Sequence, residues 1–158
     1  MYDLHKGDDA GWPFVYYDHF KKKKMLSPEY GGDGKKTVEG KYLDPVVAFP
    51  AHLGPNDLLF YTGSQFPEKY KNGAFIAFHG SWNRAPQPQG GYAVVFLPFK
   101  DGMPAGDYEI FADNFAGAKK DPEGAAHRPC GLTQGADGSL YISDDQAGRI
   151  WKVSYAKK

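Results

Sequence analysis

The side chains best suited to binding chemistry gather in a few turn-rich stretches between apolar runs. The densest stretch is His79 to Arg84, where imidazole, hydroxyl, indole, amide and guanidinium groups follow closely on one another. Trp82, His79 and Asn83 form a combination suited to stacking on a carbohydrate and hydrogen-bonding it. Other polar candidates stand in three further stretches: His52, His127, Arg128, Asp144, Asp145 and Gln146.

Each of these groups also has a purely structural interpretation. Trp82 could cover the end of a sheet while Arg84 forms a surface ion pair, and Arg128 could hydrogen-bond loop carbonyls. His52 has the surroundings of an ordinary loop histidine. Asp144-Asp145 could bind a cation, but two adjacent carboxylates lack a defined ligand spacing. The residues alone leave both interpretations open.

Composition and motifs exclude several classes of function. Nineteen Lys and Arg balance nineteen Asp and Glu, so no overall field attracts nucleic acid. Cys130, a candidate buried apolar residue, is the single cysteine, which excludes an internal disulfide and cysteine-based metal motifs. The apolar run Tyr92 to Phe99 is far shorter than the roughly 20 residues that a membrane helix needs, so membrane insertion is not expected. Gly31-Gly32-Asp33-Gly34 does not stand between a strand and a helix, so it is not a dinucleotide site.

Short β-rich runs bounded by turns recur along the chain, whereas helical periodicity is lacking. Within 57–113, the pattern predicts strands at Asp57–Tyr61, Ala74–Phe78, Tyr92–Phe99 and Tyr108–Ala112, with a hairpin turn at Asp101-Gly102. Four antiparallel strands of this length correspond to one complete blade of a β-propeller. Pro67–Tyr70 is predicted to form a single helical turn inside this blade.

A second set of strands is predicted in 126–155, at Cys130–Gln134, Leu140–Ser143 and Ile150–Tyr155. A fourth, closing strand is not present, which predicts an incomplete last blade. The segment 1–56 is the least regular, with one possible strand at Trp12–Tyr17. We therefore predict a single all-β domain over 1–158, a partial propeller of about three blades' worth of antiparallel sheet.

Strand direction alternates within a blade, so the loops that enter the first strand and join the second to the third lie on one face. These loops are 49–56, 79–91, 115–129 and 144–148, and they contain the polar candidates named above. Loops on a rigid scaffold are where binding groups tend to lie. We therefore expect the candidate residues to meet at one end of the sheets.

Several segments resemble the pyrroloquinoline-quinone (PQQ)-dependent glucose/sorbosone dehydrogenase family, and its sorbosone dehydrogenase branch in particular. The resemblance runs in order across nearly the whole chain through these segments: Gly7-Asp8-Asp9-Ala10-Gly11-Trp12-Pro13, Phe60-Tyr61-Thr62-Gly63-Ser64-Gln65-Phe66-Pro67, Gly73-Ala74-Phe75-Ile76-Ala77-Phe78-His79-Gly80-Ser81-Trp82-Asn83-Arg84, His127-Arg128-Pro129 and Asp137-Gly138-Ser139-Leu140-Tyr141-Ile142-Ser143-Asp144-Asp145. It implies the C-terminal half of a six-bladed propeller that binds PQQ, a tricarboxylate, together with calcium.

The resemblance also implies roles for particular residues. Five of them fall where the family binds its cofactor: His79, Ser81, Asn83, Arg84 and Arg128. His52 and Trp82 fall at the substrate mouth. The family's catalytic base and calcium ligands belong to the first half of the propeller, so no catalytic or metal-binding residue is assigned here.

The leading hypothesis is therefore part of a PQQ-dependent sugar dehydrogenase, inactive as an isolated chain. It would be completed by a missing N-terminal half or by self-association. The family implies a periplasmic or secreted location, although the chain begins without a signal peptide. The alternatives are a non-catalytic propeller remnant that binds a carbohydrate or a protein, and an inert truncation product.

Overall fold

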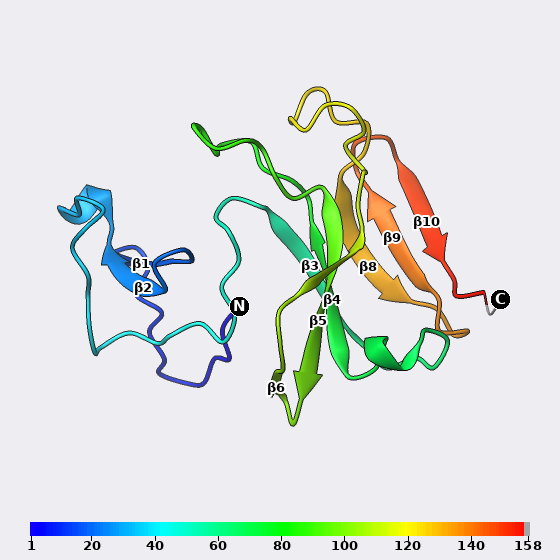
Figure 1. Cartoon of the computed structure of the whole chain (residues 1–158), viewed down its shortest axis with the longest axis horizontal. Coiled ribbons are helices and arrows are strands. Elements are labelled where there is room, and N and C mark those ends of the chain that lie inside the picture. Colours follow the sequence, from blue (N-terminus) through cyan, green and yellow to red (C-terminus); the bar gives the residue numbers. More distant parts are fainter. Residues whose placement is uncertain (157–158) are drawn as a thin grey trace. The chain divides into compact units, whose positions relative to one another are not determined.

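The chain forms two compact units, Met1–Ala51 and His52–Lys158, in this computed structural model (Figure 1). The structure describes residues 1–156. It is built almost entirely of antiparallel strands, with two short 3-10 turns. The predicted all-β class is therefore confirmed.

The first unit is organised around one hairpin. Strands β1 (Val15–Asp18) and β2 (Lys23–Leu26) pair from Val15↔Leu26 to Asp18↔Lys23, and the turn η1 (Pro28–Tyr30) follows. The Asp18 carboxylate closes the hairpin by accepting hydrogen bonds from the backbone N–H groups of Phe20 and Lys21. Val15 and Met25 are buried.

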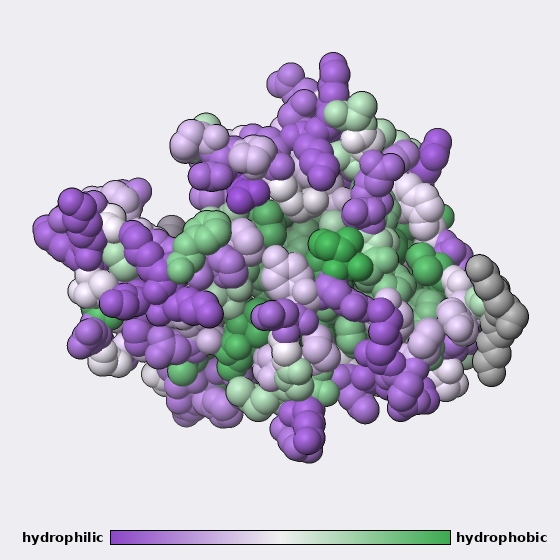
Figure 2. Space-filling model, viewed as in Figure 1, coloured by the Kyte–Doolittle hydropathy of each residue, from purple (hydrophilic) through white to green (hydrophobic). Residues whose placement is uncertain are grey.

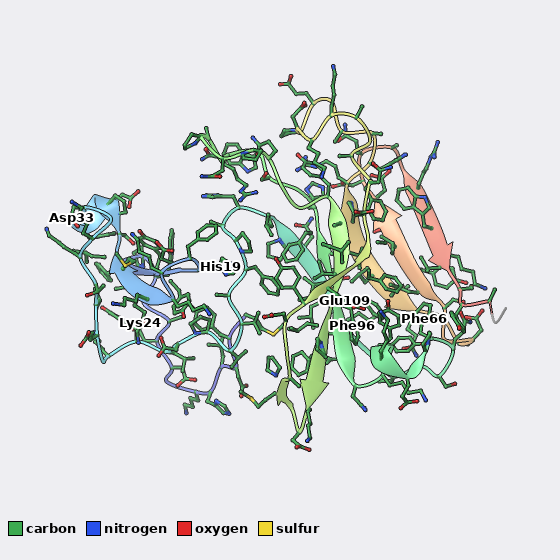
Figure 3. All side chains as sticks on the ribbon, viewed as in Figure 1. His19, Lys24, Asp33, Phe66, Phe96 and Glu109 are labelled. Carbon is green, nitrogen blue, oxygen red and sulfur yellow. The ribbon has the colours of Figure 1, made fainter. Side chains whose placement is uncertain are left out.

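The strand predicted at Trp12–Tyr17 begins later than expected. The backbone N–H of Val15 bonds the carbonyl of Gly11 at 2.8 Å, which folds residues 12–14 into a turn instead of a strand. Lys24, labelled in Figure 3, is largely covered and donates to the carbonyl of Tyr42 at 2.6 Å. This member of the lysine-rich run is thus held by its own unit.

The second unit contains a larger and a smaller sheet. The larger sheet comprises β3 (Pro55–Tyr61), β4 (Gly73–Phe78), β5 (Ala93–Lys100), β6 (Met103–Pro104) and β7 (Glu109–Ala112), in the order β3-β4-β5, with β6 and β7 both pairing with β5. The four strands predicted in 57–113 are confirmed within two residues at each end. The turn η2 (Glu68–Tyr70) confirms the predicted helical turn.

One connection in this sheet differs from the expectation. The turn at Asp101-Gly102 leads to β6 and not directly to the fourth strand, β7. Asp101 and Gly102 adopt positive φ values of 52° and 80°, which suits a tight hairpin, and Lys100 pairs with Met103. Pro104 then has no N–H to offer the ladder, and the chain leaves the sheet before β7 begins.

The smaller sheet comprises β8 (Pro129–Gln134), β9 (Leu140–Asp144) and β10 (Arg149–Val153), in the order β10-β9-β8. The strand predicted at Ile150–Tyr155 ends at Val153. The reason lies in its partner, because Val153 pairs with Leu140, the first residue of β9, and no further residue of β9 remains to pair.

A hydrophobic core lies between the two sheets of this unit. One face of β4 and β5 contributes Phe75, Ala77, Val94 and Phe96, at the alternate positions that share a face. The smaller sheet contributes Leu132, Leu140 and Ile142. Phe66 and Phe96 are labelled in Figure 3. Each fully buried side chain of this kind stabilises the fold by about 1.5–3 kcal/mol relative to exposure, so this core holds the sheets face to face.

Polar side chains also join the two sheets. Asp57 on β3 accepts a hydrogen bond from the backbone N–H of Leu132 on β8 at 2.7 Å. The buried hydroxyl of Tyr61 donates to the carbonyl of Gly138 at 2.8 Å. Gln134 accepts from the backbone N–H groups of Thr62 and Gly63, both at 3.0 Å. These directional bonds fix the sheets relative to each other, and with them the loops at their ends.

The partial six-bladed propeller and the single domain over 1–158 stay predictions. Among residues 1–156, no helix has the length and apolar character to cross a membrane.

Candidate functional site

The predicted loops of the second unit are tied together at one end of its sheets. The loop between β4 and β5 and the loop between β7 and β8 project from this end (Figure 1). The backbone N–H groups of His79 and Gly80 bond the carbonyls of Gly54 and Leu53 at 2.7 and 3.0 Å. The carbonyls of the same two residues accept from Arg128. The structure therefore brings the segment before β3 and these two loops together.

Arg128 acts within this assembly as a cross-link. Its Nε donates to the carbonyl of His79 at 3.2 Å and its Nη2 to the carbonyl of Gly80 at 3.0 Å. The guanidinium carbon lies 5.7 Å from the centre of the Tyr92 ring. Arg128 thus hydrogen-bonds loop carbonyls, the structural interpretation given above. Its other N–H groups are left for the predicted contact with a cofactor.

Asp144 joins the end of β9 to residues that precede β8. Its buried carboxylate accepts from the backbone N–H of Arg128 at 2.8 Å and from the ring of His127 at 2.8 Å. It also accepts from the N–H groups of Gln146 and Ala147 at 3.0 and 3.1 Å. Burial alone would raise the pKa of Asp144, but these hydrogen bonds outweigh it and hold the pKa below its ordinary value.

The adjacent acidic residue has a different partner. Asp145 lies 2.8 Å from Nε2 of His79, and its side chain is more than half exposed. The two neighbouring carboxylates therefore bond two different histidines, Asp144 with His127 and Asp145 with His79. This arrangement explains the acidic pair without a cation.

Ser81 is occupied by its own loop. Its hydroxyl donates to the side-chain oxygen of Gln89 at 2.5 Å and accepts from the backbone N–H of Gly90 at 2.8 Å. The residue is almost completely buried. Ser81 therefore joins the outgoing and returning segments of the β4–β5 loop. Its hydroxyl group supports the candidate site but does not line it.

Tyr92 is the residue of this region that sequence reasoning missed. Its ring packs with Ala116 and Ala125 of the neighbouring loop, and its hydroxyl donates to the carbonyl of Ser81 at 2.7 Å. Burial is the main reason that the pKa of Tyr92 lies above its ordinary value. The sequence pattern predicts Tyr92 as the first residue of a strand. In the structure, Tyr92 precedes β5 and has a φ of 56°.

The close approach of the chain to Tyr92 requires glycine at position 80. Gly80 has a φ of 107°, and a Cβ at this position would lie 2.4 Å from a ring carbon of Tyr92. A side chain could fit only if the ring moved. The Gly80-Ser81 segment and Tyr92 are therefore complementary in shape.

The tip of the loop is built differently. Trp82 is 74% exposed and Asn83 is exposed, while Arg84 is partly covered and donates from Nη1 to the carbonyl of Pro88 at 3.1 Å. His52, at the other sequence-predicted position on this face, is exposed with a φ of 62°. Hydrophilic side chains predominate over these projecting loops (Figure 2).

Some side-chain N–H groups of this region are not bonded within the protein, and these suit a cofactor that carries carboxylates. Arg84 uses one of its five N–H groups and Arg128 two, so both retain donors suited to carboxylates. The exposed amide of Asn83 adds another donor. Ser81 and the Nε2 atom of His79 are already bonded within the protein. The set that fits direct contact is thus Asn83, Arg84 and Arg128.

A calcium site of the side-chain type does not form within the described residues. Among residues 1–156, no group of three or more His, Cys, Asp or Glu side chains is arranged to hold a metal ion.

The sequence matches known proteins across most of its length. The TrAA12-like family model matches residues 19–156. A pyrroloquinoline quinone-dependent pyranose dehydrogenase of Coprinopsis cinerea is 29% identical over 91% of this chain and 22% of its own length. An uncharacterised protein of Borreliella burgdorferi is 32% identical over 93% of this chain and 36% of its own length. The chain thus spans about a third or less of these relatives.

Solved structures share the fold at lower identity. The calcium structure of a Trichoderma reesei carbohydrate-active enzyme of family AA12 superimposes with a TM-score of 0.68 at 24% identity, over 91% of this chain and 38% of that one. The holo form of the Coprinopsis cinerea pyranose dehydrogenase PQQ domain gives 0.65 at 22% identity, over 95% and 41%.

The expected kinship with PQQ-dependent dehydrogenases is confirmed, while the sorbosone branch stays a prediction. With a family model that covers residues 19–156, this chain belongs to the TrAA12-like family.

Proposed function

We propose that this chain is the part of a PQQ-dependent sugar dehydrogenase that contributes cofactor-binding loops but not the catalytic base. The observation that carries the proposal is the cross-linked loop assembly, in which Arg128 joins two loops and the neighbouring tip presents Asn83 and Arg84. The TrAA12-like family and the pyranose dehydrogenase relative support it. The proposed substrate is a sugar of the aldose or sorbosone type.

The proposed roles follow from which donors remain available. Asn83, Arg84 and Arg128 hold the carboxylates of PQQ, because guanidinium and amide groups bind carboxylates through charge-assisted hydrogen bonds. His79 and Ser81 orient this loop through Asp145 and Gln89. His52 and Trp82 lie at the substrate mouth. When bound, PQQ supplies the two-electron oxidant for the sugar.

The remainder of the site is proposed to come from outside residues 1–158. A missing N-terminal half of the propeller is the first candidate, and self-association is the second. Calcium binds in that remainder, and the assembled enzyme works in the periplasm or outside the cell. Sedimentation at micromolar concentration tests self-association, since a folded monomer at every concentration would exclude it.

A PQQ titration with calcium present tests the proposal, followed by quenching of tryptophan fluorescence. Arg84→Ala and Arg128→Ala should each weaken binding by about tenfold, the equivalent of one lost charge-assisted bond. Lys100→Ala is the matched control, because this exposed cation ends β5 far along the strand from Ala93, where the loop joins. Absence of saturable quinone binding by the folded chain would refute the proposal.

The exposure of Trp82 favours one alternative, a non-catalytic propeller remnant that binds a carbohydrate. Binding of a protein partner is a second form of this alternative. Sugar binding without any quinone binding would favour the remnant over the dehydrogenase.

A further inference from the structure

A small pocket lies in the first unit, beside the turn that joins β1 to β2. It encloses about 260 Å³, and the polar side chains of its lining belong to Lys22, Lys23, Lys24, Thr37, Glu39 and Asp44. Its volume lies just below the roughly 300–1,000 Å³ of typical small-molecule sites, so the pocket suits a small ion or a single charged group. We propose that this pocket binds a phosphate group through its three lysine side chains.

The three lysines are consecutive in the chain, yet all of them line the same pocket. In a regular strand, successive side chains point to opposite faces, which would separate the middle lysine from its neighbours. Here β2 begins only at Lys23, and Lys22 has a φ of 51° in the preceding turn, so the alternation does not extend across it. Three ammonium groups around one small volume repel one another, and a bound anion would relieve this repulsion.

One of the three ammonium groups is fixed by the protein itself. The side chain of Lys24, labelled in Figure 3, is only 12% exposed. Its Nζ donates to the carbonyl of Tyr42 at 2.6 Å and lies 3.3 Å from a carboxylate oxygen of Asp44. In contrast, Lys22 and Lys23 are exposed, and within residues 1–156 their ammonium groups form no hydrogen bond or ion pair. Two of the three cations are therefore available to a ligand.

The segment that contributes Thr37 to the lining is bonded along β2. The backbone N–H of Val38 bonds the carbonyl of Lys24 at 2.9 Å, and the N–H of Leu26 bonds the carbonyl of Lys36 at 3.0 Å. Thr37 lies between these two bonds, and its side chain is exposed, so its hydroxyl can donate to an anion. Because these backbone bonds position the lining before a ligand arrives, less conformational freedom is lost on binding.

The type of cation in this pocket favours phosphate over a carboxylate. The first unit contains no arginine, since Arg84, Arg128 and Arg149 all belong to the second unit. A planar guanidinium matches a carboxylate through two parallel hydrogen bonds, whereas an ammonium group is a compact point charge that commonly binds phosphate. The oxygens of a phosphate group can accept from several ammonium groups at once.

Two carboxylates also line the pocket, but they differ in what they oppose. Asp44 is paired with Lys24, so the charges of these two side chains offset each other. Glu39 is exposed and, among residues 1–156, has no ion-pair partner, so its charge opposes an anion in the pocket. The unpaired side chains are thus two ammonium groups and one carboxylate, an excess of one positive charge. Removing the charge of Glu39 should therefore strengthen phosphate binding.

Nuclear magnetic resonance of the ¹⁵N-labelled chain tests the inference, which does not rest on the proposed function. The titration with inorganic phosphate is done at about pH 8, so that phosphate is mostly a dianion. We expect the amide signals of Lys22, Lys23, Thr37 and Gly40 to shift saturably. Sodium chloride at the same ionic strength is the control, because nonspecific screening acts alike for both salts. Equal shifts with the two salts would overturn the inference.

Matched variants test which side chains bind the phosphate. Lys22→Ala and Lys23→Ala should each weaken binding by about threefold, as expected for an exposed ion pair, and Glu39→Gln should tighten it by about threefold. Lys6→Ala and Glu29→Gln are the controls, because these exposed residues of the same unit do not line the pocket. If both lysine variants leave binding unchanged, or if Glu39→Gln weakens it, the assignment is wrong.

Vesicles distinguish a free phosphate from the phosphate of a lipid headgroup. Phe20 stands in the same turn and is 78% exposed, so it would contact the apolar part of a bilayer if a headgroup occupied the pocket. Binding to phosphatidylglycerol vesicles that both Phe20→Ala and Lys23→Ala weaken, with none to phosphatidylcholine, supports the inference with a lipid as the source. Saturable binding of inorganic phosphate without vesicle binding supports it with free phosphate. A folded chain that binds neither overturns it.

Discussion

The base and the tip of the β4–β5 loop differ in almost every physical respect. The loop base, defined as His79, Gly80, Ser81 and their partners Tyr92 and Arg128, is covered and bonded through both backbone and side chains. The loop tip, Trp82 to Arg84, is largely exposed and directly follows Ser81 of the base in the chain. One continuous motif therefore contains both supporting and presenting residues.

The contrast between base and tip explains how an exposed site can remain ordered. Most polar groups of the base are bonded within the protein, so its geometry does not depend on a ligand. The tip can then present an indole, an amide and a guanidinium with few bonds of its own. If the comparison is correct, substitutions in the base should cost stability, while substitutions in the tip should cost binding alone.

The largest effect is expected from Asp144→Ala. The substitution removes the charged acceptor of the N–H groups of Arg128, Gln146 and Ala147, and hydrogen bonds to a charged group contribute about 1.5–3 kcal/mol each, less where the donor is exposed. We expect a loss of about 3 kcal/mol in the free energy of unfolding, measured by urea denaturation. Asp145→Ala, which removes one exposed contact, should cost less than about 1 kcal/mol. Equal losses in the two variants would contradict the role of Asp144.

Gly80→Ala should lower the free energy of unfolding by about 2 kcal/mol. The new Cβ meets the Tyr92 ring, and a φ of 107° is strained for a residue with a side chain. Gly102→Ala provides the control, since its φ of 80° imposes backbone strain but its Cβ would meet open space. The difference between the two variants, measured by denaturation, isolates the contact with Tyr92. A difference of zero would mean that the ring moves freely.

The pH dependence of stability tests the same base without a substitution. The pKa of Asp144 is lower in the folded chain, so its stabilising effect is fully present above about pH 4, its ordinary range, and is lost as the pH falls through the folded-state pKa. Protonation keeps both oxygens, so the loss is smaller than in Asp144→Ala. Asp144→Asn should flatten the acid limb of stability against pH, as followed by thermal melting. An unchanged acid limb would assign the effect to other carboxylates.

Tyr92→Phe keeps the ring but removes the hydrogen bond to the carbonyl of Ser81. It should lower the free energy of unfolding by about 1 kcal/mol, the usual net value of one hydrogen bond. Hydrogen exchange should also become faster at the backbone N–H groups of Ser81 and Gly90, which close the loop. Tyr155→Phe, at an exposed position, is the control. Unchanged exchange would show that the hydroxyl does not support the loop.

The smallest effect on stability is expected at the tip. Trp82→Ala should change the free energy of unfolding by less than about 0.5 kcal/mol, as is usual for exposed positions without buried contacts. If denaturation shows that Trp82→Ala lowers the free energy of unfolding by more than about 1 kcal/mol, the tip also stabilises the fold and does not differ from the base in this respect.

The sequence predicted the sheets of the second unit well because their signals are local. Aromatic and β-branched runs between Gly-containing turns indicated β3 to β5 and β8 to β10 within a few residues. The predicted strand ends were wrong where the pairing with a neighbouring strand decides where a strand stops. Val153 ends β10 because Leu140 begins its partner, and Pro104 interrupts the ladder after β6, neither of which is visible in a single strand's composition.

The candidate site could be located but not resolved from sequence. Polar residue types predicted a set of loops that the structure brings together at one end of the sheets. Hydrogen bonds from Arg128 to loop carbonyls were one of the two interpretations that the sequence left open. The sequence could not show that Ser81 bonds Gln89, because that bond depends on how the loop folds back on itself. Tyr92 was missed because its role depends on a positive φ and on contacts with Ala116 and Ala125. The Gly-Gly pair before it was the available signal of an unusual turn.

The bond from Leu132 to Asp57 has a consequence for association between molecules. β3 and β8 are edge strands of their sheets, and unpaired edge amides are templates for the addition of another strand. Here the Asp57 carboxylate accepts from the amide of Leu132 on β8, and Gln134 accepts from the amides of Thr62 and Gly63, which directly follow β3. A strand arriving at these positions would have to displace charged or amide side chains already in place. The same contacts that align the two sheets thereby guard these edges against aggregation.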